Sequence, residues 1–289
     1  MKIAIFGQFY KTDPKHVSKL ISILEKKNLI IFIEKNYLEK LYDLPNSIKT
    51  FSNLDNSFDL LISIGGDGTI LKAITYVKDL NIPIVGLNTG RLGFLAKIQF
   101  DKLEEFIDTI VSGDYSVSER SLIEVYTSTE NKDLKSLNFA LNEISVGRKN
   151  TTSMIFIETK LDGKYLNSYW ADGLIIATPT GSTGYSLSCG GPIIMPEAEN
   201  LVITPIAPHN LNARPLVIAD NTEISLKIDG RENEFLISLD SRITTLNKNT
   251  TVKIKKSSFT IKMIEFESES FLYTLREKLM WGKDRRNSQ

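Results

Sequence analysis

The sequence predicts two domains: an N-terminal α/β domain with a mainly parallel, Rossmann-like sheet, and a C-terminal all-β domain with an antiparallel sheet. The chain has 289 residues, and about 150 residues per domain is typical. Apolar runs alternate with helical patterns in the first third, whereas strand-like alternation dominates after about residue 115. Hydrophobic residues make up 42% of the chain and charged residues 24%, which is ordinary for a folded globular protein.

We place the α/β domain at residues 1–118 and the β domain at residues 119–266. Residues 267–289 include apolar side chains at helical spacing, from Phe271 to Leu279. An amphipathic helix of this kind has no partner in an all-β domain, so we expect it to pack back onto the first domain.

Strands and helices alternate in the predicted α/β domain. The strands are predicted at residues 3–6, 29–33, 60–64 and 82–87, and the helices at residues 14–24, 37–42, 70–77 and 101–112. Asp13 and Pro14 are typical of the N-cap and the first position of a helix. Asp101 resembles the start of a capping box, and Gly113 is typical of a helix C-terminus. Buried strands that alternate with helices indicate a mainly parallel sheet covered on both faces.

The predicted β domain is built from short segments in which polar and apolar residues alternate, at residues 123–126, 154–159 and 224–228. Asp162-Gly163 and Asp229-Gly230 stand next to such segments, and this dipeptide is a strong hairpin signal because glycine tolerates positive φ. An antiparallel sheet or sandwich follows from this pattern.

Composition excludes several classes of function. Lys+Arg and Asp+Glu both count 35, so the net charge is zero and there is no basic excess for nonspecific nucleic-acid binding. Cys189 is the only cysteine, which excludes an internal disulfide, and two histidines leave little room for a zinc centre. No apolar run approaches the ~18 residues of a membrane span, and the first residues do not resemble a signal peptide. We expect a cytoplasmic protein that binds neither nucleic acid nor membranes.

A glycine-rich segment, Gly65-Gly66-Asp67-Gly68-Thr69, lies between a predicted buried strand and a helix. The glycines allow a sharp turn and a close approach to a ligand, and the helix N-terminus favours phosphate. An acid in such a turn repels phosphate unless it binds a metal ion or accepts a proton. The simpler alternative is a tight turn in which Asp67 is a cap. Residues 88–95 follow the next strand, so we expect them at the same edge of the sheet.

The richest stretch is residues 172–188, where a strand runs into a loop of glycines and hydroxyl side chains. Hydroxyl groups suit adenine edges and ribose because they both donate and accept hydrogen bonds. A surface turn is the alternative for such a loop. The dipeptide Asn142-Glu143 is nearly uninformative by itself.

Together these segments resemble the signature set of NAD kinases. The resemblance includes residues 65–69, 88–95, Asn142-Glu143, 172–188 and 208–216, in order and over essentially the whole chain. The first segment alone is shared with diacylglycerol and sphingosine kinases, whereas residues 172–193 are far more specific. The resemblance implies a transferase that phosphorylates the 2′-hydroxyl of the adenosine ribose of NAD, with ATP as donor and Mg²⁺ or a similar divalent cation. It also implies homodimers or homotetramers in which a neighbouring subunit completes each site.

The resemblance assigns roles residue by residue. Asp67 matches the acid that takes the proton from the ribose hydroxyl, although it could instead bind the metal ion. Gly68 lies next to it at the nucleotide, and Lys72 matches a basic residue near phosphate. Asn142 and Glu143 match the pair that hydrogen-bonds the adenosine moiety.

Further positions carry over by the same resemblance. Asp172 matches an acid near the nicotinamide end, and Ala207 and Arg242 match peripheral nucleotide contacts. The matched nucleotide-binding loop is Thr183, Gly184, Tyr185, Ser186, Leu187 and Ser188. Ser153 and Trp170 depart from the family pattern, where His and Arg are frequent, and Gly184 stands where Ala is common.

Two other functions compete with this interpretation. A lipid or other small-alcohol kinase could share the first glycine-rich segment, but residues 172–193 look nucleotide-specific and no acyl-chain signature is evident. A noncatalytic NAD(P)-binding regulator would have had no reason to keep Asp67, Asn142, Glu143 and Asp172 together.

Overall fold

The computed structural model describes residues 1–8, 14–41, 44, 48–150 and 153–281. The chain divides into two compact units, Met1–Glu119 with Ile261–Gln289, and Arg120–Thr260. The boundaries predicted from the sequence are residues 118 and 266. The predicted N-cap Asp13 and the polar tail after residue 281 lie outside the described residues.

The first unit contains a parallel sheet in the order β3-β2-β1-β4-β5-β6. Its strands are β1 (Lys2–Gly7), β2 (Ile30–Glu34), β3 (Lys49–Phe51), β4 (Leu60–Ile64), β5 (Ile84–Asn88) and β6 (Ile98–Gln99). Every residue of β4 and β5 is buried, as expected of strands covered on both faces. The end of β18 (Thr251–Glu265) also joins β5, since Met263 pairs with Ile84 in parallel. The predicted parallel α/β fold is confirmed.

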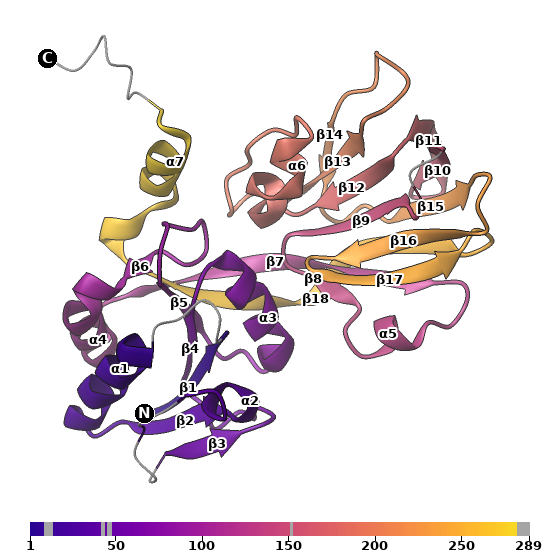
Figure 1. Ribbon diagram of the computed structural model, residues 1–289. Helices are drawn as coiled ribbons and strands as arrows, with labels where there is room; N and C mark the ends of the chain where they lie inside the picture. The colour runs from indigo at the N-terminus through magenta and orange to yellow at the C-terminus, as the bar shows by residue number, and fades with distance from the viewer. Residues whose placement is uncertain (9–13, 42–43, 45–47, 151–152, 282–289) are drawn as a thin grey trace, which may run out of the picture. The chain divides into compact units, whose positions relative to one another are not determined.

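Helices cover both faces of this sheet (Figure 1). The helices of this unit are α1 (Pro14–Lys26), α2 (Lys35–Leu38), α3 (Asp67–Val77), η2 (Phe100–Lys102), α4 (Leu103–Ser112), η4 (Glu267–Glu269) and α7 (Phe271–Leu279). Side chains of α1 and α4, including Leu20 and Phe106, share one core cluster with Ile5 and Ile62 of the sheet, while α3 lies on the other face. The last helix meets residues of the same unit, because the ring of Phe271 lies 6.0 Å from that of Phe94.

The predicted capping box at Asp101 is wrong. Asp101 belongs to η2, and its carboxylate accepts a hydrogen bond from the adjacent Lys102 amide. The α-helix begins later, at Leu103, with no side-chain cap. The predicted stop at Gly113 is confirmed, since this residue ends α4 in the left-handed conformation.

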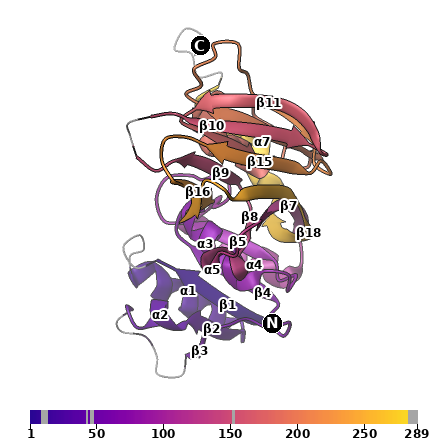
Figure 2. The same cartoon turned by 90° about the vertical axis from the view of Figure 1, so that its right-hand side faces the viewer.

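The second unit contains two layers of antiparallel strands (Figure 2). One sheet has the order β14-β13-β12-β9-β16-β17. Its strands are β14 (Leu216–Ala219), β13 (Asn200–Ile206), β12 (Gly173–Ala177), β9 (Glu143–Arg148), β16 (Glu234–Leu239) and β17 (Arg242–Asn247). The other layer contains β11 (Lys164–Ala171), β10 (Ile155–Leu161), β15 (Ile224–Asp229), the first part of β18, β7 (Ser116–Thr127) and β8 (Phe139–Ala140). The predicted antiparallel β fold is confirmed.

Alternation along the strands sorts the side chains of the six-stranded sheet between its two faces. Leu174 and Ile176 of β12 join the core between the layers, together with Ile144 and Val146 of β9. Ile175 and Ala177 lie in a smaller cluster on the outer face. The polar residues of β9, Glu143 and Ser145, therefore also lie on the outer face.

One predicted hairpin turn is confirmed and the other is wrong. Asp162 and Gly163, at φ 48° and 77°, join the paired strands β10 and β11. Asp229-Gly230 instead leads from β15 in one sheet to β16 in the other, and Gly230 has no positive φ. Among the described residues, no helix is both long enough and apolar enough to cross a membrane.

Candidate active site

A pocket of about 390 Å³ lies on the outer face of the six-stranded sheet of the second unit. Alternation along β9 and β16 delivers Glu143, Ser145, Leu236 and Ser238 to it. The full lining is Glu143, Ser145, Val146, Gly147, Arg148, Asp172, Tyr185, Ile206, Leu236, Ser238, Asp240 and Ile243. Three residues predicted from the sequence, Glu143, Asp172 and Tyr185, thus lie around one cavity.

Two buried acceptors have no hydrogen-bond partner among the described residues: Oε2 of Glu143, which lines this pocket, and Oδ1 of the preceding residue, Asn142, which does not line it. The pKa of Glu143 is raised to about 7, first by burial and second by the nearby Asp240. The backbone N–H of Tyr185 donates a hydrogen bond to the carboxylate, which lowers the pKa. A buried acceptor left unpaired costs free energy, about 1–3 kcal/mol each. Such a pair is therefore suited to bind hydroxyl or amino groups of a ligand.

A glycine lets the backbone of residues 180–188 approach these two acceptors. This segment is not an open loop, as the sequence suggests, but two short helices, η3 (Thr180–Thr183) and α6 (Tyr185–Ser188). A Cβ atom on Gly181 would lie 2.0 Å from the carbonyl oxygen of Asn142, and one on Gly184 would lie 2.9 Å from Oε2 of Glu143. At Gly181, the glycine accommodates the protein's own backbone rather than a ligand.

Hydroxyl groups in these short helices serve the fold. Ser186 and Thr204 form a buried hydrogen bond of 2.8 Å between their hydroxyl oxygens, and Thr183 donates to the carbonyl of Thr180. Leu187 is half-buried, whereas Ser188 and Tyr185 are exposed. Of the loop predicted to bind the nucleotide, Tyr185 lines the pocket.

Asp172 makes an ion pair across the pocket wall. Nη2 of Arg148 lies 3.0 Å from Oδ2 of Asp172, and both residues line the cavity. The sequence analysis missed Arg148, the last residue of β9. Alternation along β9 could not have identified it, because residue 148 has the same parity as Ile144 and Val146, which point into the core.

The remaining predicted residues of the second unit do not line this pocket. Ser153 is half-buried, and Ala207 is exposed with φ 42°. Arg242 donates a hydrogen bond of 2.6 Å to the carbonyl of Leu137 and another to the carbonyl of Phe139. It lines a different cavity of about 360 Å³.

Asp67 of the first unit is the first residue of α3, and its carboxylate binds a distant turn. Oδ2 accepts the amide of Phe94 at 2.9 Å, and Oδ1 accepts those of Leu95 and Ala96 at 3.0 and 2.9 Å. A carboxylate has about four acceptor sites, so Oδ2 retains one for a further donor. The sequence placed residues 88–95 at the same edge as Asp67, and these hydrogen bonds confirm that proximity.

The other predicted residues of the first unit are open to a ligand. Gly68 and Lys72 are exposed on α3, and a Cβ atom on Gly66 or Gly68 would meet nothing within 4 Å. The helix N-terminus with its free amide groups therefore faces open space, as a phosphate-binding turn requires.

The described residues contain no group of three or more His, Cys, Asp or Glu side chains arranged to hold a metal ion. Mg²⁺ commonly binds through one or two carboxylates together with substrate phosphates. Asp67, with one acceptor site remaining on Oδ2, is a carboxylate of this kind.

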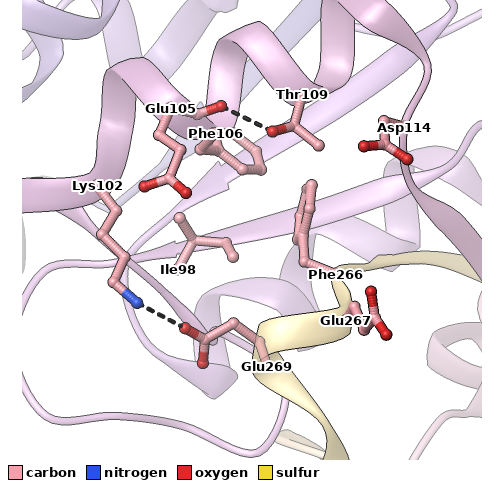
Figure 3. A pocket seen from close by; sticks show the side chains of 9 residues that line it. All are labelled: Ile98, Lys102, Glu105, Phe106, Thr109, Asp114, Phe266, Glu267 and Glu269. Carbon is pink, nitrogen blue, oxygen red and sulfur yellow. Dashed lines mark hydrogen bonds and ion pairs between the residues drawn. The ribbon is translucent and has the colours of Figure 1, made fainter.

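A second cavity, of about 510 Å³, lies in the first unit between α4 and η4 (Figure 3). Phe106 and Phe266 form apolar walls, and Lys102 forms an ion pair of 3.3 Å with Glu269. None of the residues predicted to bind substrates lines this cavity.

A glycine-rich turn at a helix N-terminus in a parallel α/β unit, and a pocket lined by charged and hydroxyl side chains in a β unit, are typical of a nucleotide-binding protein. Residues 15–115 match the ATP-NAD kinase N-terminal domain, and residues 141–266 match the ATP-NAD kinase C-terminal domain. An NAD kinase from Christiangramia forsetii is 55% identical over 295 residues, covering 99% of this chain and 100% of that protein. The chain belongs to the NAD kinase family.

Solved structures agree with this fold. Yeast NADH kinase, crystallised with NADH, has a TM-score of 0.86 and 24% identity, covering 100% of this chain and 90% of that chain. At that identity the likeness shows the fold alone. An NAD kinase from Archaeoglobus fulgidus in complex with ATP has a TM-score of 0.77 and 26% identity, covering 97% of this chain and 99% of that chain.

Proposed function

We propose that this chain transfers the γ-phosphoryl group of ATP to the 2′-hydroxyl of the adenosine ribose of NAD, producing NADP and ADP. The observation that carries the proposal is a pair of adjacent buried acceptors, on Asn142 and Glu143, that have no partner in the described part of the chain; Glu143 lines a cavity of about 390 Å³. Ribose hydroxyls and the adenine amino group are donors of the kind that these acceptors lack.

In this proposal the groups that suit a nucleoside belong to the second unit, and the groups that suit phosphate belong to the first unit. Glu143 and Asn142 accept hydrogen bonds from the adenosine moiety, while Asp172, paired with Arg148, and Tyr185 form further walls of the pocket. The open N-terminus of α3 at Gly66 and Gly68 binds phosphate oxygens, with Lys72 one turn further along the helix.

Phosphoryl transfer depends mainly on positioning and charge neutralisation. The ribose oxygen forms a bond to the γ-phosphorus, the bond from that phosphorus to the β–γ bridging oxygen breaks, and ADP leaves. Asp67 takes the hydroxyl proton on the remaining acceptor site of Oδ2. A divalent cation bound to the ATP phosphates neutralises their charge and enters as part of the substrate.

The charged lining of the pocket, with Glu143, Arg148, Asp172 and Asp240, favours NAD over a lipid substrate. To test this, the protein is incubated with ATP, Mg²⁺ and either NAD or diacylglycerol in detergent micelles, and the products are identified by mass spectrometry. We expect phosphorylated NAD and no phosphatidic acid. The reverse result would establish a lipid kinase, and tight NAD binding without product would indicate a regulator.

We further propose a cytoplasmic homodimer or homotetramer. Phe156 and Trp170 pair across β10 and β11 and are 46% and 52% exposed, which is a large aromatic surface for a solitary subunit. A solution mass equal to one chain would contradict this assembly.

A further inference from the structure

We infer that Asp240 and Arg242 are positioning residues that clamp residues 137–143 and so present Asn142 and Glu143 to the nucleotide. This inference rests on the proposed function for its consequence in binding, but the clamp itself is a property of the second unit. Asp240 is the first residue of the two-residue turn between β16 and β17, and Arg242 directly follows this turn, since Leu239 pairs with Arg242.

Asp240 binds the amide side of the segment. Its Oδ1 accepts the amides of Asn142 and Glu143 at 2.8 and 3.2 Å, and its Oδ2 accepts the amide of Leu141 at 3.0 Å. The backbone amide of Asp240 also donates to the carbonyl of Glu143 at 2.9 Å. Four hydrogen bonds from one residue therefore fix the backbone on which the two acceptor side chains stand.

Arg242 binds the carbonyl side of the same segment. Its guanidinium donates to the carbonyls of Leu137 and Phe139 and lies 5.3 Å from the centre of the Phe139 ring. A guanidinium carries several donors in a rigid plane, so it can bind two carbonyl groups at once, which a lysine ammonium does less well. Asp240 thus binds backbone N–H groups of residues 137–143, and Arg242 binds backbone carbonyl groups of the same segment.

The turn is built to hold Asp240 in this place. Asp240 has φ 52°, which a two-residue hairpin requires and which aspartate tolerates better than most residues. Backbone amides form stronger hydrogen bonds with a charged acceptor than with a neutral one. The arrangement has an electrostatic consequence, because Asp240 adds its negative charge close to Glu143.

The test compares Asp240→Asn and Arg242→Lys with the matched control Asp162→Asn. Asp162 is also an aspartate with positive φ in a hairpin turn, the one between β10 and β11, and its Oδ1 accepts the amide of Glu223. Hydrogen exchange of the amides at 141–143 is measured by mass spectrometry without any ligand. NAD affinity and steady-state kinetics are then measured on the same preparations.

We expect amide exchange at 141–143 to accelerate by at least about tenfold in Asp240→Asn, because a charged hydrogen-bond acceptor is lost. The Kd and KM for NAD should rise by a similar factor while kcat falls much less, and Asp162→Asn should change none of these. Arg242→Lys should act in the same direction, and it carries the test alone if Asp240→Asn does not fold.

Each contrary result has its own meaning. Unchanged exchange at 141–143 in both variants would overturn the clamp. Faster exchange with unchanged NAD affinity would overturn its role in binding. If the unaltered protein binds no NAD, the proposed function fails, and the exchange measurement still decides whether the clamp exists.

Discussion

Glu143 combines burial with a carboxyl group that must accept hydrogen bonds, and this combination has a measurable effect on stability. Its pKa rises from an ordinary value of 4.5 to about 7, first because of burial and second because of Asp240. A carboxyl whose pKa is raised by folding contributes stability that is fully present below pH 4.5 and is lost as the pH rises through 7.

Glu143→Gln removes this titration while keeping the shape of the side chain. Between pH 5 and pH 8 the unaltered protein should lose about 2 kcal/mol of unfolding free energy through this titration, and the variant should not. The unfolding free energy of the variant minus that of the unaltered protein should therefore rise by this amount. Urea unfolding at both pH values measures the difference. Glu232 is an exposed glutamate, and Glu232→Gln is the control. Its unfolding free energy should differ from that of the unaltered protein by the same amount at pH 5 and at pH 8. A pH-independent effect of Glu143→Gln would show that the raised pKa is wrong.

Asp67 is the residue to which the proposed chemistry assigns the proton. Asp67→Asn keeps the size of the side chain but removes its charge, so we predict that kcat falls by at least about a hundredfold. NAD affinity should stay the same or tighten, because repulsion of phosphate is relieved.

Kinetics and calorimetry on one preparation test this prediction. The matched control is Asp55→Asn, since Asp55 also accepts a backbone amide, that of Ser57, but is not a predicted site residue. The control should leave kcat unchanged. Near-normal turnover of Asp67→Asn would remove this residue from the mechanism, and loss of NAD binding with kcat retained would make it a residue that only holds residues 94–96.

At the scale of elements, two identical dipeptides show how far local sequence determines structure. Gly163 has φ 77° with open space around it, whereas Gly230 has no positive φ and a Cβ there would meet Ile155 at an ordinary 3.4 Å. We predict that Gly163→Ala destabilises the protein by about 1–2 kcal/mol because it strains a left-handed turn. Gly230→Ala should change stability by less than about 0.5 kcal/mol. Urea unfolding compares them, and equal losses would contradict the two turn assignments.

Periodicity predicted most elements of the first unit, because burial on one or two faces leaves a direct mark on the sequence, whereas strands of the second unit such as β13, β16 and β17 were not predicted. The strand predicted at residues 60–64 coincides with β4, and the stop of α4 at Gly113 follows from backbone conformation alone. Asp229-Gly230 was not predictable in the same way, since its local pattern is that of a hairpin and only the partners of β15 and β16 show otherwise.

Site residues could be predicted where they belong to a strand pattern or to a family motif, as Glu143 and Asp172 do. Long-range contacts of carboxylates with backbone amides leave no such mark. Asp67 binds amides 27 to 29 residues away, and Asp240 binds amides 97 to 99 residues away. A backbone amide is present at every non-proline residue, so the sequence cannot indicate which ones a given aspartate meets.

At the scale of the whole molecule, the chemistry is divided between two units of different architecture. The turn that suits phosphate lies in the parallel α/β unit, and the pocket lined by Glu143, Asp172 and Tyr185 lies in the β unit. Each unit has its own hydrophobic core, so each holds its own predicted site residues on a rigid framework. The proposed function is the phosphorylation of one particular hydroxyl of NAD.

The most direct measurement is to locate the phosphate in the product of a reaction with ATP, Mg²⁺ and NAD, using phosphorus–proton correlation in NMR spectra. We predict one phosphate on the 2′-oxygen of the adenosine ribose, with one ADP formed for each NADP. A phosphate on the 3′-oxygen or on the nicotinamide ribose, or ADP formed without phosphorylated NAD, would contradict the account.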